Sequence, residues 1–501
     1  SLENRVRLLR EVLEETRDAV GDRCAVAIRL AVDELLGPEG ITSQGEGREI
    51  IEMLAELPDL WDVNLSDWEN DSITSRFSEE GCQEQYVAFV KSMTTKPVVG
   101  VGRFTSPDAM VSQINRGILD MIGAARPSIA DPFLPKKIEQ GRSDEIRECI
   151  GCNTCVSGQL TFTPMRCTQN PSVGEEWRRD WHPEFIPPRG SDDNVLVVGA
   201  GPAGLEAARA LGQRGYTVTL AEARTELGGR VSQECRLPGL AAWGRVRDWR
   251  TGRIQEMPNV QVYLDNKLTA EEILSLDYRH VILATGARWR SDGVGVTNWE
   301  SIPGTDQGHV VSPENVFAGE NLIGPVVVFD DDKFYMGAVI AEKLRLEGLE
   351  VTLVTTAPEV SQWTHNTLEQ HRIQARVLEL GIKVITSHNI SKVGSSEINT
   401  VCVYSNRPGV VAASTVVLVT SRRPDNEIYL RLTEDSNRLA DSGIASVIAI
   451  GDCLSPSTIA SAVYEGHRVA REMDAPPEDP DMPFRREKIL LENLDSQGNN
   501  T

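Results

Sequence analysis

The sequence of 501 residues lacks any apolar run of about 18 residues, which is the length that a membrane-spanning helix requires. It also lacks an excess of basic residues, because 51 Lys and Arg stand against 74 Asp and Glu, and the formal net charge is -23. Non-specific binding to nucleic acid or to anionic membranes depends on clustered positive charge. We therefore predict that neither nucleic acid nor a membrane is a partner of this protein.

Cysteine is also scarce, with nine residues in the whole chain, which is few for a scaffold held together by disulfides. Five of the nine are scattered in apolar or mixed surroundings, and we interpret them as small core residues: Cys24, Cys82, Cys235, Cys402 and Cys453. Reduced thiols predict a cytoplasmic protein, because the cytosol keeps thiols reduced. The length of the chain leaves room for two or three domains.

The other four cysteines fall in one short segment. Cys149, Cys152 and Cys155 are separated by two residues each, and Cys167 follows after eleven residues. Four thiolates can enclose a zinc ion or hold the irons of a 4Fe–4S cluster. Zinc sites more often combine two separate CxxC pairs, whereas three ligands in one tight loop suit a cubic cluster. The spacing therefore predicts a 4Fe–4S cluster, with zinc as the alternative.

Short apolar stretches alternate with helical patterns in residues 1–148. The expected strands are 24–31, 61–66, 97–103 and 119–126, and the expected helices between them are 48–57, 83–94 and 107–116. Near-continuous apolar strands separated by helices indicate a parallel sheet that is covered on both faces. Four such units predict the second half of a (β/α)8 barrel, with its active site at the carboxyl ends of the strands. Because four strands cannot close a barrel, we expect the first half to precede Ser1.

Polar residues stand where such a barrel would place its site. Arg29 interrupts an apolar strand, Gly102 and Arg103 end the third strand, and Ala125 and Arg126 end the fourth. A small residue lets backbone N–H groups approach a ligand closely, and the neighbouring guanidinium can pair with a phosphate. The two pairs together favour a phosphorylated cofactor, although either arginine alone could be a solvated residue after a strand.

A dinucleotide-binding pattern begins after a linker rich in proline. Gly199, Gly201 and Gly204 lie between an expected strand (194–198) and a helix, and Glu222 follows the next strand. Glycines at these positions let the backbone reach a pyrophosphate at the helix N-terminus, and the acid can accept hydrogen bonds from ribose hydroxyls. Gly228, Gly229 and Arg230 follow, as in flavoprotein disulfide reductase-like domains, and the segments 281–286 and 447–452, the second ending at Asp452, resemble the two later motifs of that fold. The sequence predicts either ADP or FAD at this site.

A second strand–turn–helix pattern begins with the strand at 326–329, but Asp330, Asp332 and Tyr335 stand where glycines would be expected. Carboxylates repel a pyrophosphate, so we predict a domain that keeps the fold and does not bind NAD(P)H. The alternative is a ligand that uses another register. The predicted α/β domains are therefore a half barrel (1–148), a cluster segment with linker (149–193), an ADP- or FAD-binding domain (194–322 and 405–474), a degenerate NAD(P)-like domain (323–404) and an extended tail (475–501).

The segments 1–5, 100–103 and 125–132, together with the cysteine segment, resemble the old yellow enzyme superfamily. They are most similar to its multidomain branch, which contains trimethylamine dehydrogenase and 2,4-dienoyl-CoA reductase. The resemblance covers essentially the whole chain, and the cysteine spacing resembles that of the amine dehydrogenases. It implies FMN in the barrel mouth, with Arg29 near the flavin pyrimidine edge and with Arg103 and Arg126 at the phosphate.

The resemblance also implies a site for a cationic amine beside an aromatic side chain and an aspartate. The matching positions are Trp68 and Asp71, although the alternatives are a packed aromatic side chain and a solvated acid. A further aromatic position of the family is Gln159 in this chain. We therefore predict a methylated amine with a polar or carboxylate group, such as dimethylglycine or N-methylproline, in preference to trimethylamine.

The leading hypothesis is oxidative N-demethylation by a homodimer. A hydride would pass from an N-methyl carbon to FMN, and the iminium product would hydrolyse to formaldehyde and the demethylated amine. The resemblance implies that electrons then pass through the 4Fe–4S cluster to an electron-transferring flavoprotein. One alternative is an NADPH-dependent 2,4-dienoyl-CoA or enoate reductase. Another is a non-catalytic electron-transfer subunit whose half barrel is completed by a second polypeptide.

Overall fold

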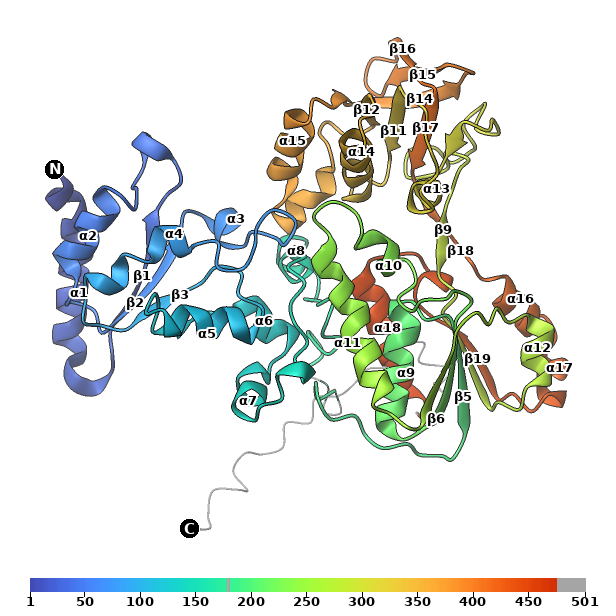
Figure 1. Ribbon diagram of the computed structural model, residues 1–501, viewed down its shortest axis with the longest axis horizontal. Coiled ribbons are helices and arrows are strands. Elements are labelled where there is room, and N and C mark those ends of the chain that lie inside the picture. Colours follow the sequence, from blue (N-terminus) through green and yellow to red (C-terminus); the bar gives the residue numbers. More distant parts are fainter. Residues whose placement is uncertain (177, 179–180, 475–501) are drawn as a thin grey trace. The chain divides into compact units, whose positions relative to one another are not determined.

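The computed structural model describes residues 1–176, 178 and 181–474 (Figure 1). The chain divides into two compact units. Unit 1 comprises Ser1–Thr163, Arg230–Trp249 and Ala287–Pro424. Unit 2 comprises Pro164–Gly229, Arg250–Gly286 and, of the described residues, 425–474. The predicted extended tail, 475–501, lies outside the described residues.

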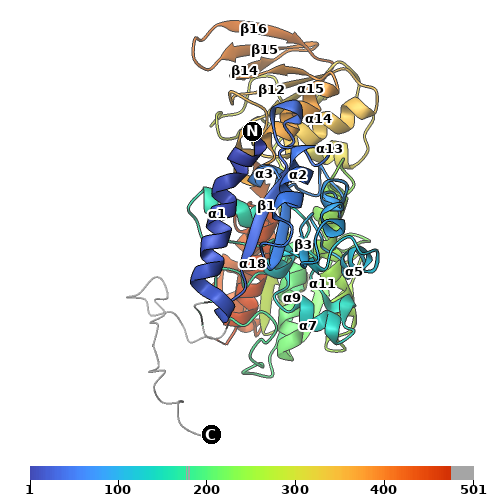
Figure 2. The same cartoon turned by 90° about the vertical axis from the view of Figure 1, so that its left-hand side faces the viewer.

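Unit 1 begins with four parallel strands in the order β1-β2-β3-β4, as expected for half of a (β/α)8 barrel. The strands are β1 (Ala27–Asp33), β2 (Leu60–Leu65), β3 (Val98–Gly100) and β4 (Met121–Ile122). The long helices beside them are α1 (Leu2–Val20), α2 (Glu46–Leu54) and α5 (Pro107–Asn115). Helices α1 and α2 pack against each other, as Figures 1 and 2 show. The predicted half barrel is therefore confirmed.

The two faces of this sheet differ in chemistry because successive side chains of a strand point to opposite sides. Ile28 of β1 and Trp61 and Val63 of β2 are buried in an apolar core with side chains of α1 and α2. Arg29 and Asp62 alternate with them and are partners in the parallel register of β1 and β2. The helix-facing side chains thus build the core, and the opposite face carries the charged groups of the candidate site.

The fourth strand differs from the prediction. It covers only Met121–Ile122, and the helix α6 (Ala125–Ala130) begins at the residue that was expected to end the strand. Pro127 fits the first turn of this helix, where a backbone N–H has no partner within the helix. Ala125 and Arg126 therefore begin a helix instead of ending a strand. The predicted helix 83–94 is also divided, into α4 (Glu84–Val87) and a 3-10 turn (Val90–Ser92).

Unit 1 also contains a second α/β domain, residues 310–419, with a parallel sheet in the order β10-β17-β11-β12-β13. The strands are β10 (Val310–Val311), β17 (Thr415–Val419), β11 (Val326–Asp330), β12 (Val351–Thr355) and β13 (Lys383–Ile385). An antiparallel sheet adds β14 (His388–Val393), β15 (Glu397–Cys402) and β16 (Pro408–Ala412). The domain is wider than the predicted 323–404, because the fully buried strand β17 fits between β10 and β11.

The main helices of this domain are α14 (Met336–Leu346) and α15 (Gln370–Glu379). A two-stranded antiparallel pair, β9 (Ala287–Trp289) with β18 (Arg422–Pro424), lies where the chain enters and leaves the domain. The shorter helices elsewhere are α3 (Trp68–Asp71), α7 (Leu134–Glu139), α8 (Thr154–Leu160), α10 (Val231–Glu234), α11 (Arg245–Gln255), α12 (Ala270–Ser275), α13 (Pro313–Phe317), α16 (Glu427–Thr433) and α17 (Ser436–Asp441).

Unit 2 is built on a parallel sheet in the order β19-β8-β5-β6-β7. The strands are β19 (Ser446–Ala449), β8 (His280–Leu283), β5 (Asn194–Val198), β6 (Thr217–Ala221) and β7 (Val260–Tyr263). Counted along the chain this is the order 3-2-1-4-5 of a doubly wound dinucleotide fold. Helices α9 (Pro202–Arg214) and α18 (Ile459–Glu472) pack closely, because Gly466 leaves no side chain between them. The predicted dinucleotide-type fold is confirmed.

No helix in the described part of the chain combines the length and the apolar character of a membrane span.

Candidate functional site

The charged face of the half barrel carries a polar network that joins two of the predicted site residues. Arg29 Nη2 lies 2.7 Å from Asp71 Oδ2, and its Nη1 lies 3.1 Å from Asp62 Oδ2. Gln83 Nε2 donates to the other oxygen of Asp71 over 2.9 Å. Two carboxylates thus share one guanidinium, which leaves a formal charge of minus one at neutral pH. A charge of that sign favours a cationic ligand at this face.

Arg103 lies beside this network and has unused hydrogen-bonding capacity. Its side chain is buried, and neither its Nε nor its Nη1 has a hydrogen-bond partner. Burial lowers the pKa of Arg103, and the nearby Arg245 and Arg126 lower it further. Buried N–H groups of a cation without partners cost free energy, so an anion at these atoms would be stabilising. The arrangement fits the phosphate of a cofactor.

The loop around Arg103 brings it close to both Gln83 and the cysteine segment. Gly102 has φ 147°, and a Cβ at this position would lie 3.4 Å from Gln83 Cβ. Arg103 itself has φ 57°, which few residues other than glycine adopt. A Cβ at Gly151, between the first two cysteines, would lie 3.1 Å from Arg103 Nη1. The chain therefore packs closely against the turn at Gly102 and, at Gly151, against one nitrogen of the Arg103 guanidinium.

The second predicted phosphate ligand, Arg126, is used mainly within the protein. Its Nη1 donates to the carbonyl oxygens of Ser72 and Ile73, each at 3.1 Å, and to Asn153 Oδ1 at 2.6 Å. Asn153 is buried in the cysteine segment with φ 54°, and its Nδ2 donates to Ser72 O over 2.7 Å. Arg126 and Asn153 together fix the loop that follows Asp71. A phosphate contact by Arg126 stays a prediction.

The two other predicted substrate residues lie on different helices. Trp68 begins the single-turn helix α3, which Asp71 ends, and 42% of its surface is exposed. Gln159 is exposed near the end of α8. The structure thus joins Trp68 to Asp71 through one helical turn. Trp68 is exposed, whereas the Asp71 side chain is 18% exposed and bonded to Arg29 and Gln83. The role of Gln159 stays a prediction.

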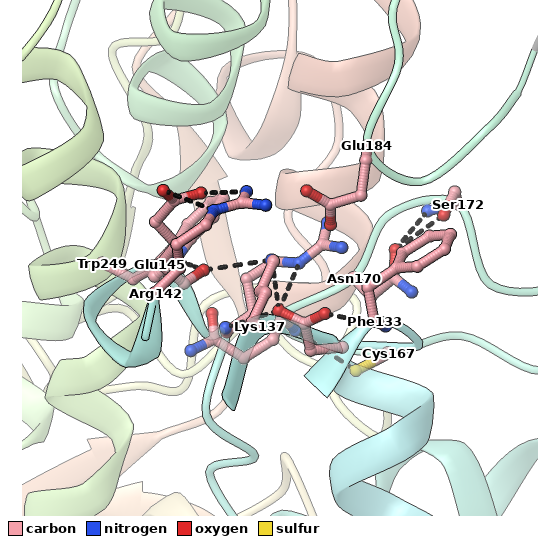
Figure 3. A network of polar contacts seen from close by, with 12 residues as sticks. Phe133, Lys137, Arg142, Glu145, Cys167, Asn170, Ser172, Glu184 and Trp249 are labelled. Atoms are coloured by element: carbon pink, nitrogen blue, oxygen red, sulfur yellow. Dashed lines mark hydrogen bonds and ion pairs between the residues drawn. The ribbon is translucent and has the colours of Figure 1, made fainter. Parts of the chain in front are cut away.

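The segment that leads to the first cysteine is fixed by buried polar contacts (Figure 3). Lys137 Nζ pairs with Asp131 Oδ2 at 2.7 Å, and both side chains are buried. Lys137 Nζ also donates to the carbonyl oxygen of Glu145 over 3.2 Å, and Trp249 Nε1 donates to the same oxygen over 3.0 Å. These contacts hold the chain close to Cys149.

Backbone N–H groups donate to the sulfur atoms of two of the predicted ligands. Gly151 N–H donates to Cys149 Sγ over 3.3 Å, and Gln169 N–H donates to Cys167 Sγ over 3.4 Å. Burial raises the pKa of Cys149. Hydrogen bonds from N–H groups would help to hold a negative sulfur there. The first three cysteines belong to unit 1, and Cys167 belongs to unit 2.

Among the described residues, no three side chains of His, Cys, Asp or Glu are grouped closely enough to hold a metal ion. The 4Fe–4S cluster at the four cysteines therefore stays a prediction. Within unit 2, Cys167 is followed by a buried network. Arg250 binds Gln169 Oε1 at 2.9 Å and Glu206 Oε2 at 2.8 Å, and thereby links this segment to helix α9.

The glycine loop of unit 2 has the form that a pyrophosphate site needs. Gly199 has φ 100°, and a side chain there would overlap the Ala284 carbonyl oxygen. A Cβ at Gly204 would overlap the carbonyl oxygen of Gly199, so this glycine lets the helix approach the loop. A Cβ at Gly201 would meet no protein atom within 4 Å. The space beside Gly201 is open at the N-terminus of α9, where a phosphate is favoured.

Glu222, the predicted ribose acceptor, is already bonded to the chain. Its Oε2 accepts from Ala200 N–H at 2.7 Å and its Oε1 from Arg224 N–H at 2.8 Å. Glu222 therefore holds the glycine loop to the end of β6, and its contact with a ribose stays a prediction.

The remaining residues predicted for this nucleotide site are Gly229, Asp452 and Arg230. Gly229 has φ 55°, and its Cβ would lie 2.9 Å from Gly201 Cα. Asp452 Oδ1 accepts from Ser457 N–H at 2.9 Å. Arg230 belongs to unit 1, where its Nε pairs with Glu234 Oε1 at 2.9 Å.

The corresponding loop of the second α/β domain is filled by a carboxyl group. Asp330 is fully buried, its Oδ1 accepts from Lys333 N–H at 2.9 Å, and its Oδ2 has no partner. A Cβ at Gly337, in the first turn of α14, would overlap this carboxyl group. Burial, together with the charge of Asp332, raises the pKa of Asp330 to about 8. Burial also raises the pKa of Asp332 to about 6. These features support the predicted loss of dinucleotide binding.

Three profiles of protein families match the chain. The NADH:flavin oxidoreductase / NADH oxidase family matches residues 1–145, and the pyridine nucleotide-disulphide oxidoreductase family matches residues 193–305. The OYE-like second alpha/beta domain matches residues 311–423. Together with the half barrel and the two nucleotide-type folds, these matches define a multidomain flavin oxidoreductase, and the protein is an enzyme.

Comparison with individual proteins identifies the branch of the flavin oxidoreductases to which the chain belongs. Dimethylamine dehydrogenase from Hyphomicrobium sp. (strain x) is 40% identical over 97% of this chain and 70% of its own length. Histamine dehydrogenase from Rhizobium sp. 4-9 is 49% identical with a TM-score of 0.93, over 98% of this chain and 72% of that chain. The 6-hydroxypseudooxynicotine amine oxidase of Pseudomonas geniculata N1 is 51% identical with a TM-score of 0.90, over 94% of this chain and 70% of that chain. The chain belongs to the trimethylamine dehydrogenase-like branch of the old yellow enzyme superfamily.

Sequence reasoning missed several residues of the barrel site. Asp62 could have been found, because it stands opposite Arg29 once two parallel strands are aligned. The sequence did not indicate a role for Gln83 or Asn153, because neither belongs to a motif whose chemistry requires an amide. Their importance comes from contacts with residues distant in the sequence, Asp71 and Ser72.

Proposed function

We propose that this protein is a flavin-dependent amine dehydrogenase whose active site lies at the charged face of the half barrel. One observation carries the proposal: Gln83 of the Arg29–Asp71–Gln83 network packs against Gly102, and the next residue, the buried Arg103, has two nitrogen atoms without a hydrogen-bond partner among the described residues. A negatively charged network next to an anion-binding arginine suits a cationic substrate beside a phosphorylated cofactor. Three of the similar proteins are named for the oxidation of amines, which supports the same assignment.

FMN is the cofactor that we propose for the barrel. Arg103 would hold its phosphate, and Arg29 would lie near the pyrimidine edge of the ring, where a cation stabilises the reduced anionic form. A bound flavin supplies the acceptor for a hydride from the carbon next to the amine nitrogen. In unit 2 we propose ADP or FAD at the loop of Gly199, Gly201 and Gly204, because the space beside Gly201 is open.

Trp68 and Asp71 would bind and orient the amine. The face of an exposed indole attracts a cationic nitrogen, and two carboxylates against one guanidinium favour positive charge nearby. Arg29, whose side chain is half exposed, could pair with a substrate carboxylate, which keeps dimethylglycine and N-methylproline among the candidates. Dimethylamine and histamine are the candidates supported by the more similar proteins.

For an N-methylated amine, the products would be formaldehyde and the demethylated amine. A cationic amine first loses the proton on its nitrogen to solvent. The neutral amine then loses a hydride, which is two electrons and a proton, as the iminium forms, and water adds to the iminium carbon. We propose that the electrons leave to an electron-transferring flavoprotein, with a 4Fe–4S cluster at Cys149, Cys152, Cys155 and Cys167 as the carrier of single electrons. The ligand spacing and the N–H donors at two of the sulfurs support this part of the proposal. We also propose a cytoplasmic homodimer.

The amine hypothesis is tested by following the flavin absorbance of the purified holoenzyme without oxygen. Dimethylamine, histamine, dimethylglycine, trimethylamine and NADPH are each added to a separate sample. We expect bleaching by at least one amine and none by NADPH. Bleaching by NADPH alone would establish the reductase alternative in place of the amine dehydrogenase.

The cluster is tested by metal analysis of the same preparation. We expect about four iron and four sulfide per chain, as a 4Fe–4S cluster contains. Cys155→Ser should lower the iron content, whereas Cys402→Ser, outside the segment, should leave it unchanged. Stoichiometric zinc with no sulfide would contradict the cluster.

A further inference from the structure

The second α/β domain makes direct polar contacts with the loop that carries the proposed substrate residues. We define residues 66–77 as the substrate loop. Its helix α3 has Trp68 and Asp71 at its ends, with Glu69 and Asn70 between them. Arg372, on helix α15 of the second α/β domain, binds Glu69 Oε1 at 2.9 Å and Asn70 Oδ1 at 2.8 Å. One arginine thus holds the two residues that separate Trp68 from Asp71.

The part of the loop after α3 is attached to the same domain by buried contacts. Thr74 Oγ1 donates to Glu369 Oε1 at 2.9 Å, and Arg76 Nη2 pairs with Glu342 Oε2 at 3.0 Å. Both ion-pair partners are almost fully buried. Asn153 Nδ2 donates to Thr367 O at 2.9 Å as well as to Ser72 O. These anchors fix the base of the loop, and their burial means that removing one of them would also destabilise the fold.

Arg372 differs from these buried anchors. Its side chain is 19% exposed and that of Glu69 is 36% exposed, so the pair contributes little to folding stability. Helix α3 has only a single turn, capped by Asp67, whose Oδ1 accepts from Asn70 N–H. A helix this short has no stability of its own and depends on contacts from outside. Arg372 supplies two such contacts from another domain.

We propose that the second α/β domain serves as a positioning device for the amine site, with Arg372 as a positioning residue that sets helix α3. This inference rests on the proposed function, because Trp68 and Asp71 matter for an amine only if the substrate binds there. It gives a purpose to a domain whose dinucleotide loop is filled by Asp330. Arg372 touches neither substrate nor cofactor; it acts through Glu69 and Asn70 on the distance between the indole face and the carboxylate.

The test compares the holoenzyme with Arg372→Ala, Arg372→Lys and Arg372→Glu. For the best amine substrate, we expect Arg372→Ala to raise KM about tenfold, equivalent to about 1.4 kcal/mol of binding, with little change in kcat. Arg372→Lys should recover part of the loss, because a point charge still attracts Glu69 but cannot donate to two acceptors at once. The exposed neighbour His371 provides the control variant His371→Ala, which should match the parent protein.

Exchanging the charges of Arg372 and Glu69 distinguishes a positioning role from a general loss of folding stability. Arg372→Glu and Glu69→Arg should each weaken binding, and the double variant should restore KM toward that of the parent. Tetramethylammonium gives an independent binding constant, because it is cationic but has no lone pair from which an iminium could form. Its Kd should follow KM through the series. A loss of kcat and thermal stability with no recovery in the double variant would overturn the positioning role.

Hydrogen exchange keeps the inference distinct from the proposed function. Amide exchange in residues 66–73 should become faster in Arg372→Ala than in His371→Ala, whatever the substrate is. If no amine reduces the flavin of the parent protein, the proposed function fails. If amide exchange in residues 66–73 is also the same in Arg372→Ala and His371→Ala, the role of Arg372 in holding helix α3 is overturned as well. If the parent protein is active and Arg372→Ala changes neither KM nor exchange, the inference alone is overturned.

Discussion

The two nucleotide-type folds of this chain show how one supersecondary pattern can keep or lose a ligand site. In unit 2, Gly199 and Gly201 lie in the turn after β5 and Gly204 lies in the first turn of α9, and a Cβ at Gly201 would meet no atom of the described residues within 4 Å. In the second α/β domain, β11 ends at Asp330, whose carboxyl group lies against Gly337 at the start of α14. Both domains have a strand, a turn and a helix. In unit 2 the space before the helix is open, whereas in the second α/β domain the Asp330 carboxyl group fills it.

This difference shows that the fold and the ligand site depend on separate sets of residues. The strands of both sheets are buried apolar runs, and they form whether or not the turn can accept a pyrophosphate. The turn decides binding, because a phosphate needs free N–H groups and an absence of negative charge. The domain whose loop is filled makes a different contact, because Arg372 of its helix α15 binds the substrate loop.

The largest effect is expected where a glycine of the open loop has no room for a side chain. Gly204→Val should prevent stable folding of unit 2, because even a Cβ would overlap the Gly199 carbonyl oxygen. Gly201→Val is the matched variant, since its side chain would enter open space. We expect Gly201→Val to keep the thermal midpoint and to lose most of the nucleotide released on denaturation, as measured by chromatography. Full nucleotide content in Gly201→Val would show that the ligand lies elsewhere.

A smaller effect is expected from the carboxyl group that fills the other loop. The pKa of Asp330 is raised to about 8 by burial, so the folded state binds a proton that the unfolded state releases near pH 4. The stability that this proton provides is complete below about pH 4 and is lost as the pH rises toward 8. Asp330→Asn removes this dependence and should stabilise the protein at high pH by up to a few kcal/mol.

The measurement is the thermal midpoint of Asp330→Asn relative to the parent protein at pH 5, 7 and 9. We expect the difference in favour of the variant to grow from pH 5 to pH 9. Glu379→Gln, at an exposed carboxylate of the same domain, is the control and should show no such trend. A constant difference across this range would mean that Asp330 is ionised in the folded protein.

Local sequence patterns predicted the regular elements well wherever apolar runs were bounded by clear turn residues. The strands expected at 194–198 and 217–221 coincide with β5 and β6, because each is a continuous apolar run next to a glycine turn. The fourth barrel strand was predicted too long, since nothing in the pattern of 119–126 shows that a helix starts at Ala125. Whether such a segment extends a strand or begins a helix depends on tertiary packing.

The candidate site was less predictable because its contacts join residues far apart in the chain. Arg29 and Asp71 were both predicted, but for separate ligands, and their ion pair spans 42 positions. The contact of Arg372 with Glu69 spans 303 positions and lies between two domains. Sequence spacing carries no information about such pairs unless a motif fixes both residues. The glycine loop of unit 2 was predictable because all of its residues lie within one turn.

The smallest effect concerns whether the filled loop can be opened again. The double variant Asp330→Gly, Asp332→Gly removes two of the three consecutive carboxylates before α14; the third, Asp331, stays bonded to Thr297. The change frees the start of this helix for a phosphate. We expect the parent protein to show no saturable NADPH binding by fluorescence and the double variant to bind weakly, because only the repulsion and the obstruction have been removed. The contacts that would recognise the rest of the nucleotide have not been restored. Saturable binding by the parent protein would contradict the comparison, since the Asp330 carboxyl group would then have to leave its buried position to admit the ligand. Weak binding by the double variant alone would show that the turn, and not the remainder of the fold, determines which of the two domains holds a nucleotide.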